Sequence, residues 1–365
     1  MTSQPEAPCI WIAGGGTGGH LYPGLSLASA IRAARPDARI LFVGTRYGLD
    51  ADLVPRHGFR VAFLPTGRGS PLSLRHPLNA ARFLHALWVC RRLLRDERPD
   101  VIVSLGGFAA SVPGLMGAWK GIPLLLLEQN VLPGRVTRLL SRWATEIHSQ
   151  FDEARAHLGG RARFHYSGSP ARPEIAALAS ARPEGTRLLI MGGSQGARRL
   201  NELVRDALPR LLDAGIPVTH ISGSRDHPLV EAAYRDLPPE RAQLLSYVDD
   251  MAGVLAQSRM AFVRAGASTM NDIELAGVPS VLVPFPHARD DHQTANARVF
   301  EQAGCGVVWP EDTLAPETFA DRLIALWNNA AVLEDMRAAL RRRARPTAAA
   351  DIAAAVLRLA ARPAP

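Results

Sequence analysis

Short apolar runs alternate with longer amphipathic segments along both halves of the chain. Runs of three to five mostly apolar residues predict buried strands, and segments with apolar residues at helical spacing predict the helices between them. In the first half the predicted strands are Cys9–Ala13, Arg39–Val43, Val61–Leu64, Val101–Ser104, Leu124–Glu128 and Glu146–Ser149. In the second half they are Arg187–Met191, Val218–Ser222, Gln243–Ser246, Met260–Val263, Ser280–Val283 and Gly306–Val308. Such alternation is typical of a parallel sheet covered by helices on both faces, and here it occurs twice.

A segment rich in proline and glycine, Ser167–Pro173, separates the two halves. We therefore expect an α/β protein with two doubly wound parallel-sheet domains, residues 1–168 and 169–345. The tail from Ala315 onward is helical in pattern. We expect residues 346–365 to form a C-terminal helix that packs back toward the N-terminal domain.

A glycine-rich stretch, Ala13–Pro23, follows the first strand and precedes an apolar segment, Gly24–Ala34, that predicts a helix. Gly14, Gly16 and Gly19 match the G-x-G-x-x-G spacing, which lets backbone N–H groups approach an anion at a helix N-terminus. A dinucleotide site would also need an acidic residue at the end of the second strand. That strand ends in glycine and threonine, which argues against NAD, and no Gly-Lys-Ser/Thr follows to make a Walker P-loop. A glycine-rich loop without a ligand stays open as an alternative.

Two further turns of small residues lie in the second half. Gly192–Ala197 follows a predicted strand and precedes a helical segment, Arg198–Leu212. Gly266–Thr269 leads into another helix that we expect to begin near Thr269, and it offers a second anion cradle in the same domain. Two nucleotide-type halves suit an enzyme that holds a phosphorylated donor in one domain and an acceptor in the other.

Charge and cysteine content narrow the class of protein. The 365 residues carry a net charge of +8, almost all of the positive charge being arginine, since Lys120 is the single lysine. The excess of positive charge could bind nucleic acid, anionic lipid or a phosphorylated substrate, or it could reflect genome composition alone. The arginines are scattered and not interleaved with aromatic residues, which argues against nucleic acid. Cys9, Cys90 and Cys305 share no ligand spacing and predict buried thiols in a reducing cytosol.

The chain shows no basic leader and no apolar run near the ~18 residues that span a bilayer, so we expect a cytoplasmic protein that could still sit on a membrane. One segment, His76–Arg98, is both apolar and basic. One face of this predicted helix should pack on the sheet through Phe83, Leu87, Cys90 and Leu94. Leu84 and Trp88 lie elsewhere on it, among arginines, which is typical of a helix at a bilayer surface or of an ordinary surface helix.

Two aspartate pairs, Asp249–Asp250 and Asp290–Asp291, raise the question of a metal. Adjacent side chains point apart in an extended chain, and no D-x-D triplet is present to hold a metal diphosphate. We expect these aspartates to cap helices or face solvent, and no metal or other cofactor to be needed. A leaving diphosphate would then be stabilised by helix N-termini and arginines.

Seven motifs together resemble the MurG family, the UDP-N-acetylglucosamine:N-acetylmuramyl-(pentapeptide) pyrophosphoryl-undecaprenol N-acetylglucosamine transferases. They are Gly14–His20 with Pro23, Gly106–Phe108, Glu128–Asn130, Gly192–Ala197, Asp249–Met251, Arg264 with Gly266–Ala267, and Asp291–Gln293 with Asn296–Ala297. The resemblance covers nearly the whole chain, and the motifs are specific only in combination.

The resemblance implies a GT-B fold, two Rossmann-like domains facing across a cleft, with the acceptor and membrane in the first domain and UDP-N-acetylglucosamine in the second. The implied reaction is inverting transfer of N-acetylglucosamine to the N-acetylmuramyl 4-hydroxyl of lipid I, giving lipid II and UDP for peptidoglycan synthesis. It also implies a peripheral protein on the anionic cytoplasmic face of the plasma membrane.

Site residues follow from the same resemblance, position by position. Those implied for the donor are Thr17, Gly18, Asn130, Arg172, Ser194, Gln195, Val248, Met251, Asp272 and Gln293. Those implied for the acceptor are Gly16, Thr17, Gly19, His20 and Phe108, and those of a membrane patch are Leu84, Trp88 and Trp119. His20 is the candidate general base, since imidazole can take a proton near neutral pH. The alternative is that it only caps the helix or binds the acceptor pyrophosphate.

The sequence departs from the family pattern at the donor site. Asp272 stands where the family usually has a glutamate for the ribose hydroxyls, and Glu274, about 200° further around the helix, cannot simply replace it. Ser169 stands where asparagine is frequent, and the residues after Phe108 also differ. A UDP-sugar transferase acting on another lipid such as diacylglycerol is the first alternative, and a non-catalytic membrane-bound subunit that binds nucleotide sugars is the second.

Overall fold

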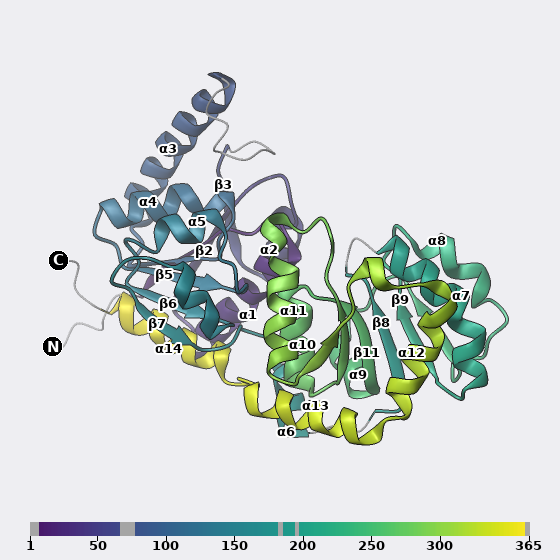
Figure 1. Cartoon of the computed structure of the whole chain (residues 1–365). Helices are drawn as coiled ribbons and strands as arrows, with labels where there is room; N and C mark the ends of the chain where they lie inside the picture. The colour runs from purple at the N-terminus through teal and green to yellow at the C-terminus, as the bar shows by residue number, and fades with distance from the viewer. Residues whose placement is uncertain (1–6, 66–76, 182–184, 194–196, 362–365) are drawn as a thin grey trace. The chain divides into compact units, whose positions relative to one another are not determined.

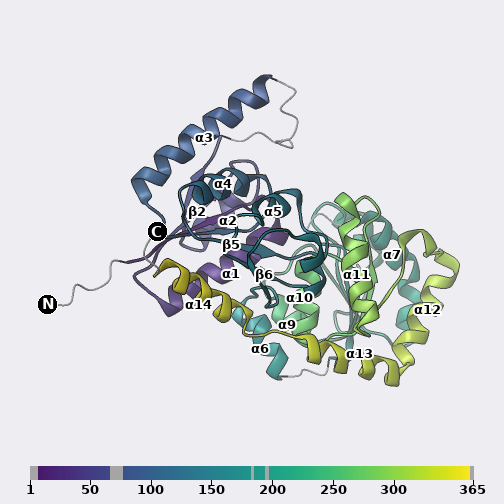
Figure 2. The ribbon, with the colours of Figure 1, turned by 60° about the vertical axis from the view of Figure 1, so that its left-hand side comes forward.

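The protein forms two compact units. The computed structural model describes residues 7–65, 77–181, 185–193 and 197–361, and Figures 1 and 2 show it from two sides. Unit 1 comprises Met1–Ala171 and Thr347–Pro365, and unit 2 comprises Arg172–Pro346. The first boundary between the units follows residue 171, three residues after the expected one at 168. The second follows residue 346, one residue after the expected one at 345.

Unit 1 is built on a sheet of seven strands. The strands are β1 (Cys9–Ala13), β2 (Arg39–Gly44), β3 (Arg60–Phe63), β4 (Val101–Ser104), β5 (Leu124–Glu128), β6 (Glu146–Ser149) and β7 (Arg163–Tyr166). The helices are α1 (Gly18–Ala34), α2 (Asp50–Arg56), α3 (Pro77–Glu97), α4 (Ser111–Trp119), α5 (Arg135–Leu140) and α14 (Ala348–Ala360), with the 3-10 turns η1 (Phe108–Ala110) and η2 (Asp152–His157). The strand order is β3-β2-β1-β4-β5-β6-β7, and every pairing is parallel.

The two faces of this sheet bury different side chains of the same strands. In β1, Ile10 and Ile12 point into the core under α1 and α14, whereas Cys9 and Trp11 point into the core under α3 and α4. Side chains alternate between faces along a strand, so a strand buried on both faces must be apolar at every position. This is why β1 reads as a continuous apolar run and was predicted with its correct ends.

The C-terminal helix α14 packs on unit 1 against α1. Ile352, Val356 and Leu359 are fully buried there, and burying each side chain is worth roughly 1.5–3 kcal/mol. One ion pair adds to this docking, because Arg358 Nη2 donates to both carboxylate oxygens of Glu146 at 2.9 Å.

Unit 2 is built on a sheet of six parallel strands in the order β10-β9-β8-β11-β12-β13. The strands are β8 (Arg187–Met191), β9 (Val218–Ile221), β10 (Ala242–Leu245), β11 (Ser258–Arg264), β12 (Ser280–Val283) and β13 (Gly306–Val308). The helices are α6 (Pro173–Ala181), α7 (Arg198–Asp213), α8 (His227–Val230), α9 (Met251–Ala256), α10 (Ala267–Ala276), α11 (His292–Gln302), α12 (Pro316–Asn328) and α13 (Ala330–Arg343), with the 3-10 turns η3 (Glu231–Ala233), η4 (Arg289–Asp291) and η5 (Glu311–Thr313).

A large apolar core joins this sheet to α7 and α12. Helix α7 contributes buried residues at positions three and four apart, among them Leu200, Leu203, Val204 and Leu208, which is the pattern of a helix with one face on a core. The Phe262 ring of β11 meets Phe319 of α12 edge-on, with ring centroids 5.1 Å apart. The prediction of two parallel-sheet α/β units is confirmed.

Several strand and helix ends differ by one to three residues from those expected, and two differences are larger. Strand β7 was missed because it alternates exposed and half-buried residues at the edge of the sheet and contains no apolar run. Helix α1 begins at Gly18 and not at Gly24, and Pro23 lies inside it. Glycine and proline both lower helix propensity, so the first turn of α1 reads as a loop in the sequence although it is helical.

Candidate active site

The glycine-rich loop of unit 1 is a tight backbone turn that only glycine can make. Gly14, Gly15 and Gly16 all have positive φ, between 82° and 136°, where L-residues are strained. A Cβ on Gly14 would lie 2.4 Å from the carbonyl oxygen of Gly106. The loop therefore packs backbone against backbone on the Gly106–Phe108 segment, which comes from the carboxyl end of β4.

A buried carboxylate fixes the same loop from the other side. Asp50, 1% exposed, accepts the N–H of Gly16 through Oδ1 at 2.8 Å and the N–H of Thr45 through Oδ2 at 3.1 Å. The sequence analysis found no carboxylate at the end of the second strand. Asp50 lies a few residues beyond it, and its two oxygens are engaged by backbone, so it serves the shape of the loop.

His20 lies in the first turn of α1, as the third residue of the helix. Its Nδ1 is 3.0 Å from Oε1 of Gln129, which follows β5. An amide carbonyl oxygen can only accept a hydrogen bond, so this contact calls for a proton on Nδ1, and in the neutral imidazole the lone pair is then on Nε2. This is the tautomer that a general base needs. Gln129 Nε2 is buried and has no hydrogen-bond partner among the described residues.

Glu128 organises the turn that carries Gln129 and Asn130. Its buried carboxylate accepts the backbone N–H of Asn130 at 3.0 Å and the side-chain amide at 3.4 Å. Burial raises the pKa of Glu128, against the opposing effects of the Asn130 N–H and of the neighbouring His20. The carboxylate thus fixes the conformation of Asn130, a predicted donor residue.

The other predicted residues of unit 1 lie on the same loops. Thr17 precedes α1 with an extended backbone, is exposed, and makes no capping bond with its side chain. Gly18 and Gly19 form the first turn of α1 and are half-buried. Phe108 opens η1 and is also half-buried. The carboxyl ends of β1 and β4 therefore carry the residues predicted for the acceptor, with His20 among them, and the end of β5 adds Gln129 and Asn130.

In unit 2 the predicted donor residues gather on the loops that follow β10, β11 and β12. Asp272 lies on α10, and burial raises its pKa to about 7, while the positive charge of Arg172 opposes this rise. Arg172 donates from Nη1 to the carbonyl oxygen of Asp249 at 3.0 Å. Helix α10 begins at Ala267, two residues earlier than expected, after the extended residue Gly266, so its N-terminal N–H groups face the end of β11.

Three further donor residues hold or line these loops. Gln293, in the first turn of α11, accepts the N–H of Phe285 through Oε1 at 2.9 Å. Val248 is half-buried before α9, and Met251 opens that helix, also half-buried. Asp250 caps α9 by accepting the N–H of Gly253 at 2.9 Å, which confirms the capping role expected for it. Ser194 and Gln195 lie outside the described residues.

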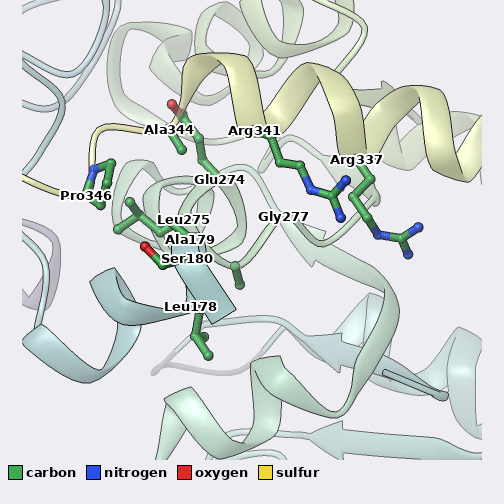
Figure 3. A pocket seen from close by; sticks show the side chains of 11 residues that line it. Leu178, Ala179, Ser180, Glu274, Leu275, Gly277, Arg337, Arg341, Ala344 and Pro346 are labelled. Carbon is green, nitrogen blue, oxygen red and sulfur yellow. The ribbon is translucent and has the colours of Figure 1, made fainter. Parts of the chain in front are cut away.

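Glu274 faces a different environment from Asp272, as its position on the helix predicted. It is 5% exposed, and its Oε2 lies 3.8 Å from Nε of Arg343. Burial raises its pKa to about 7, against the charges of Arg343 and Arg345. Glu274 lines a cavity of about 230 Å³ between α6, α10 and α13, with Arg337 and Arg341 extending from α13 (Figure 3). None of the predicted donor residues lines this cavity.

The helix expected at a membrane is present and exposes the expected side chains. In α3, Cys90 and Leu94 are buried under the sheet, whereas Leu84 is 65% and Trp88 60% exposed. Trp119, at the end of the neighbouring helix α4, is 78% exposed. Of the helices that the structure describes, none is both long and apolar enough to cross a bilayer.

Comparison with known proteins gives a family for both units. Residues 10–149 match the glycosyltransferase family 28 N-terminal domain, and residues 187–353 match the family 28 C-terminal domain. A UDP-N-acetylglucosamine–N-acetylmuramyl-(pentapeptide) pyrophosphoryl-undecaprenol N-acetylglucosamine transferase of Symbiobacterium thermophilum is 39% identical over 364 residues, which are 96% of each chain. The Ralstonia nicotianae protein of the same name is 37% identical over 98% of this chain and 100% of its own. The chain belongs to the MurG family.

Solved structures agree with this placement in the MurG family. The crystal structure of Acinetobacter baumannii MurG matches with a TM-score of 0.77 and 26% identity, over 96% of this chain and 99% of that one. The calicheamicin glycosyltransferase CalG4 matches with a TM-score of 0.70 at 20% identity, which supports the fold alone. The predicted GT-B class is confirmed by these likenesses.

Two residues of this MurG-family site were missed as individuals by the sequence analysis. Asp50 gave no signal, because an aspartate at the start of a helix is an ordinary capping residue. Gln129 stood inside a quoted motif, Glu128–Asn130, but only the structure places its oxygen on the imidazole of His20. Asp50 acts through the backbone that it holds, and Gln129 acts through the imidazole ring. Contacts of this kind join distant segments and therefore leave no local pattern in the sequence.

Proposed function

We propose that this protein transfers N-acetylglucosamine from UDP-N-acetylglucosamine to the N-acetylmuramyl 4-hydroxyl of undecaprenyl-pyrophosphoryl-N-acetylmuramyl-pentapeptide, giving lipid II and UDP. The main support is the identity of 39% with a relative named for this reaction, over 96% of both chains. The arrangement of His20, Gln129 and Asn130 on one set of loops in unit 1 is chemically consistent with it.

In this proposal the work is divided between the units. Unit 2 holds the donor. Asp272 accepts hydrogen bonds from the ribose hydroxyls, and the amide group of Gln293 binds sugar hydroxyls. Val248 and Met251 pack beside the uracil. The N-terminus of α10 and Arg172 stabilise the leaving diphosphate, and one preorganised donor of this kind can be worth about 3 kcal/mol in the transition state. Unit 1 holds the acceptor and contributes Thr17, Gly18 and Asn130 to the donor site, and His20 Nε2 takes the proton of the attacking hydroxyl.

The test is a transfer assay with purified protein, UDP-N-acetylglucosamine and a short-chain lipid I analogue, read by mass spectrometry. We expect a product heavier by one N-acetylhexosamine, and no product when diacylglycerol replaces lipid I. Transfer to diacylglycerol alone would replace the proposed acceptor. Binding of the donor without release of UDP in the presence of either lipid would favour a non-catalytic subunit.

We also propose that the exposed apolar side chains of α3 and α4 bind the anionic membrane surface, as a peripheral attachment at the cytoplasmic face. Leu84 and Trp88 project from α3 among the exposed arginines Arg82, Arg91 and Arg92. Apolar side chains that enter the headgroup region together with basic ones that face anionic lipid are the usual basis of interfacial binding.

A double variant, Leu84→Ser with Trp88→Ser, is expected to bind anionic vesicles at least about a hundredfold more weakly. Removing two side chains that leave water on binding costs roughly 1.5–3 kcal/mol each, and 1.4 kcal/mol is a factor of ten. Flotation with phosphatidylglycerol vesicles measures the effect. Tyr47→Ser, which removes an equally exposed ring outside the patch, should float like the wild type. Equal flotation of the double variant would contradict the membrane role of α3.

A further inference from the structure

One carboxylate and two imidazoles meet on a face of the sheet in unit 1, and the proposed transfer uses none of them. Glu146 and His148 are two residues apart on β6 and therefore point to the same face. His165 on β7 is the direct cross-strand partner of His148. The register of two neighbouring strands thus brings these three side chains together, without any loop.

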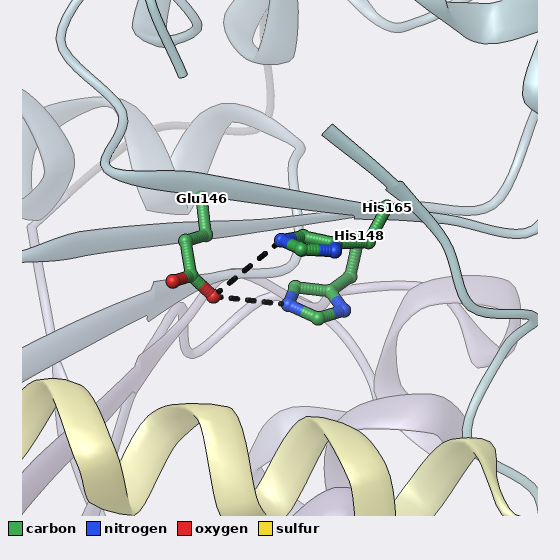
Figure 4. Close-up of side chains that lie close together, drawn as sticks. All are labelled: Glu146, His148 and His165. Carbon is green, nitrogen blue, oxygen red and sulfur yellow. Dashed lines mark hydrogen bonds and ion pairs between the residues drawn. The ribbon is translucent and has the colours of Figure 1, made fainter. Parts of the chain in front are cut away.

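The ligand atoms of these three residues are spaced like a coordination triangle. Glu146 Oε2 lies 3.4 Å from His148 Nε2 and 3.9 Å from His165 Nε2, and the three ligand atoms all lie within 4.8 Å of one another. Figure 4 shows both rings turning a nitrogen toward the same carboxylate oxygen. A tetrahedral zinc ion with bonds of about 2.0–2.1 Å needs ligands roughly 3.3–3.4 Å apart. Glu146 Oε2 and His148 Nε2 already have this spacing, and only His165 must move to complete the triangle.

Two of the three side chains are held in place by burial, and the third is exposed and free to turn. Glu146 and His148 are buried, whereas the side chain of His165 is 43% exposed on the edge strand β7. The two rings stack with centroids 4.7 Å apart and planes 18° apart. A metal lies in the plane of each imidazole that binds it, so His165 must turn out of the stack. Its exposure permits this movement and leaves room for water as a fourth ligand.

Arg358 is the group that opposes a cation here. Its Nη2 donates to both oxygens of Glu146 at 2.9 Å. However, both histidines face Oε2, so an ion on Oε2 leaves Oε1 to Arg358. A ligating carboxylate held by an outer hydrogen-bond donor is the ordinary arrangement around protein metal sites. The positive charge of Arg358 should lower the affinity without removing any ligand.

We propose that Glu146, His148 and His165 form a binding site for a late divalent transition ion of the zinc type, with water as the fourth ligand. Two imidazoles and one carboxylate suit Zn²⁺, Co²⁺ and Ni²⁺ better than Mg²⁺ or Ca²⁺, which prefer oxygen ligands. A bound ion would tie the edge strand β7 to β6 and stabilise unit 1. This proposal does not depend on the proposed transferase activity.

The experiment uses the full chain without an affinity tag, freed of metal by a chelator and titrated with ZnCl₂ by calorimetry and with Co²⁺ by visible absorption. We expect one ion per chain, the strong absorption of four-coordinate Co²⁺, and a higher melting temperature with zinc. His165→Ala should weaken binding at least about tenfold. His57→Ala, which removes an exposed histidine elsewhere in unit 1, should change nothing.

A second variant separates coordination from a general loss of structure. Arg358→Gln removes the opposing charge and keeps all three ligands, so it should bind zinc more tightly than the wild type. Its fold is checked by circular dichroism, because the same change weakens the docking of α14. Absence of binding by the wild type would overturn the proposal. So would equal affinity of the wild type and the His165→Ala variant.

Discussion

Replacing His20 with alanine is expected to lower kcat for transfer to a lipid I analogue by about 10²- to 10⁴-fold, the usual contribution of a general base. The Kd of UDP-N-acetylglucosamine should change little, because most residues proposed to hold the donor are in unit 2 and the variant keeps the three in unit 1, Thr17, Gly18 and Asn130. Steady-state kinetics with lipid I, together with calorimetric titration of the donor, separate the two effects.

The physical reason lies in how the imidazole is held. Gln129 Oε1, 3.0 Å from Nδ1 of His20, favours the neutral tautomer with the proton on Nδ1, in which the lone pair of Nε2 is available for the acceptor hydroxyl. If His20 only bound the pyrophosphate of lipid I, alanine would raise the KM for lipid I and leave kcat in place. That pattern would contradict the role of base.

Gln129→Leu provides the matched control for this argument. The variant keeps His20 and the fold of the loop but removes the acceptor that selects the tautomer. We expect a smaller fall in kcat than in His20→Ala, an unchanged donor Kd, and ¹⁵N shifts of His20 that show both tautomers. A kcat equal to that of the wild type would mean that the Gln129 contact has no part in catalysis.

Much of the fold could be predicted from the sequence because the strands of both sheets are buried on two faces. Strands such as Val101–Ser104 and Ser280–Val283 appear in the structure with the predicted ends. The edge strand β7, half-exposed, carries no such signal. The first turn of α1 was not predicted, because glycine and proline have low helix propensity. In the folded protein, packing against the Gly106 segment outweighs that propensity.

The candidate site was predictable only as far as its chemistry lies in local motifs. The glycines of the loop after β1 could be predicted from their spacing, whereas His20 was implied by the resemblance to the MurG family. The contact of His20 with Gln129 joins residues 109 positions apart, and that of Gly16 with Asp50 joins residues 34 apart. The histidine of β7 in the proposed metal site could not be placed either, since its partner is set by the register of a strand that was not predicted.

Asp272→Asn is expected to weaken binding of UDP-N-acetylglucosamine by about 10- to 100-fold at a pH well above 7. A carboxylate that accepts hydrogen bonds from ribose hydroxyls contributes about 1.5–3 kcal/mol for each bond to the charged group, and an amide replaces these only in part. Calorimetric titration of the donor measures the loss. An affinity equal to that of the wild type would mean that Asp272 does not hold the ribose.

The pH dependence of donor binding is a second, independent test of the role of Asp272. Burial raises the pKa of Asp272 to about 7 from 3.8, so the side chain is protonated below this pH and ionised above it. Ribose hydroxyls donate best to the ionised form. The donor should therefore bind more tightly to the wild type as the pH rises through about 7, and the variant should lose this dependence. The diphosphate of the donor is esterified at both ends and does not itself titrate near neutral pH.

Glu274→Gln is the control that separates donor binding from stability. Both carboxyl groups lie on α10, and burial raises the pKa of each to about 7. A folded-state pKa above the unfolded value means that the folded protein binds more protons, so the free energy of unfolding falls as the pH rises from about 4 to about 7. Each variant should flatten that fall. Only Asp272→Asn should change the affinity for the donor, because Glu274 faces Arg343 and the cavity beside α13. If Glu274→Gln weakened donor binding as much, the effect would come from α10 as a whole and not from a carboxylate on the ribose.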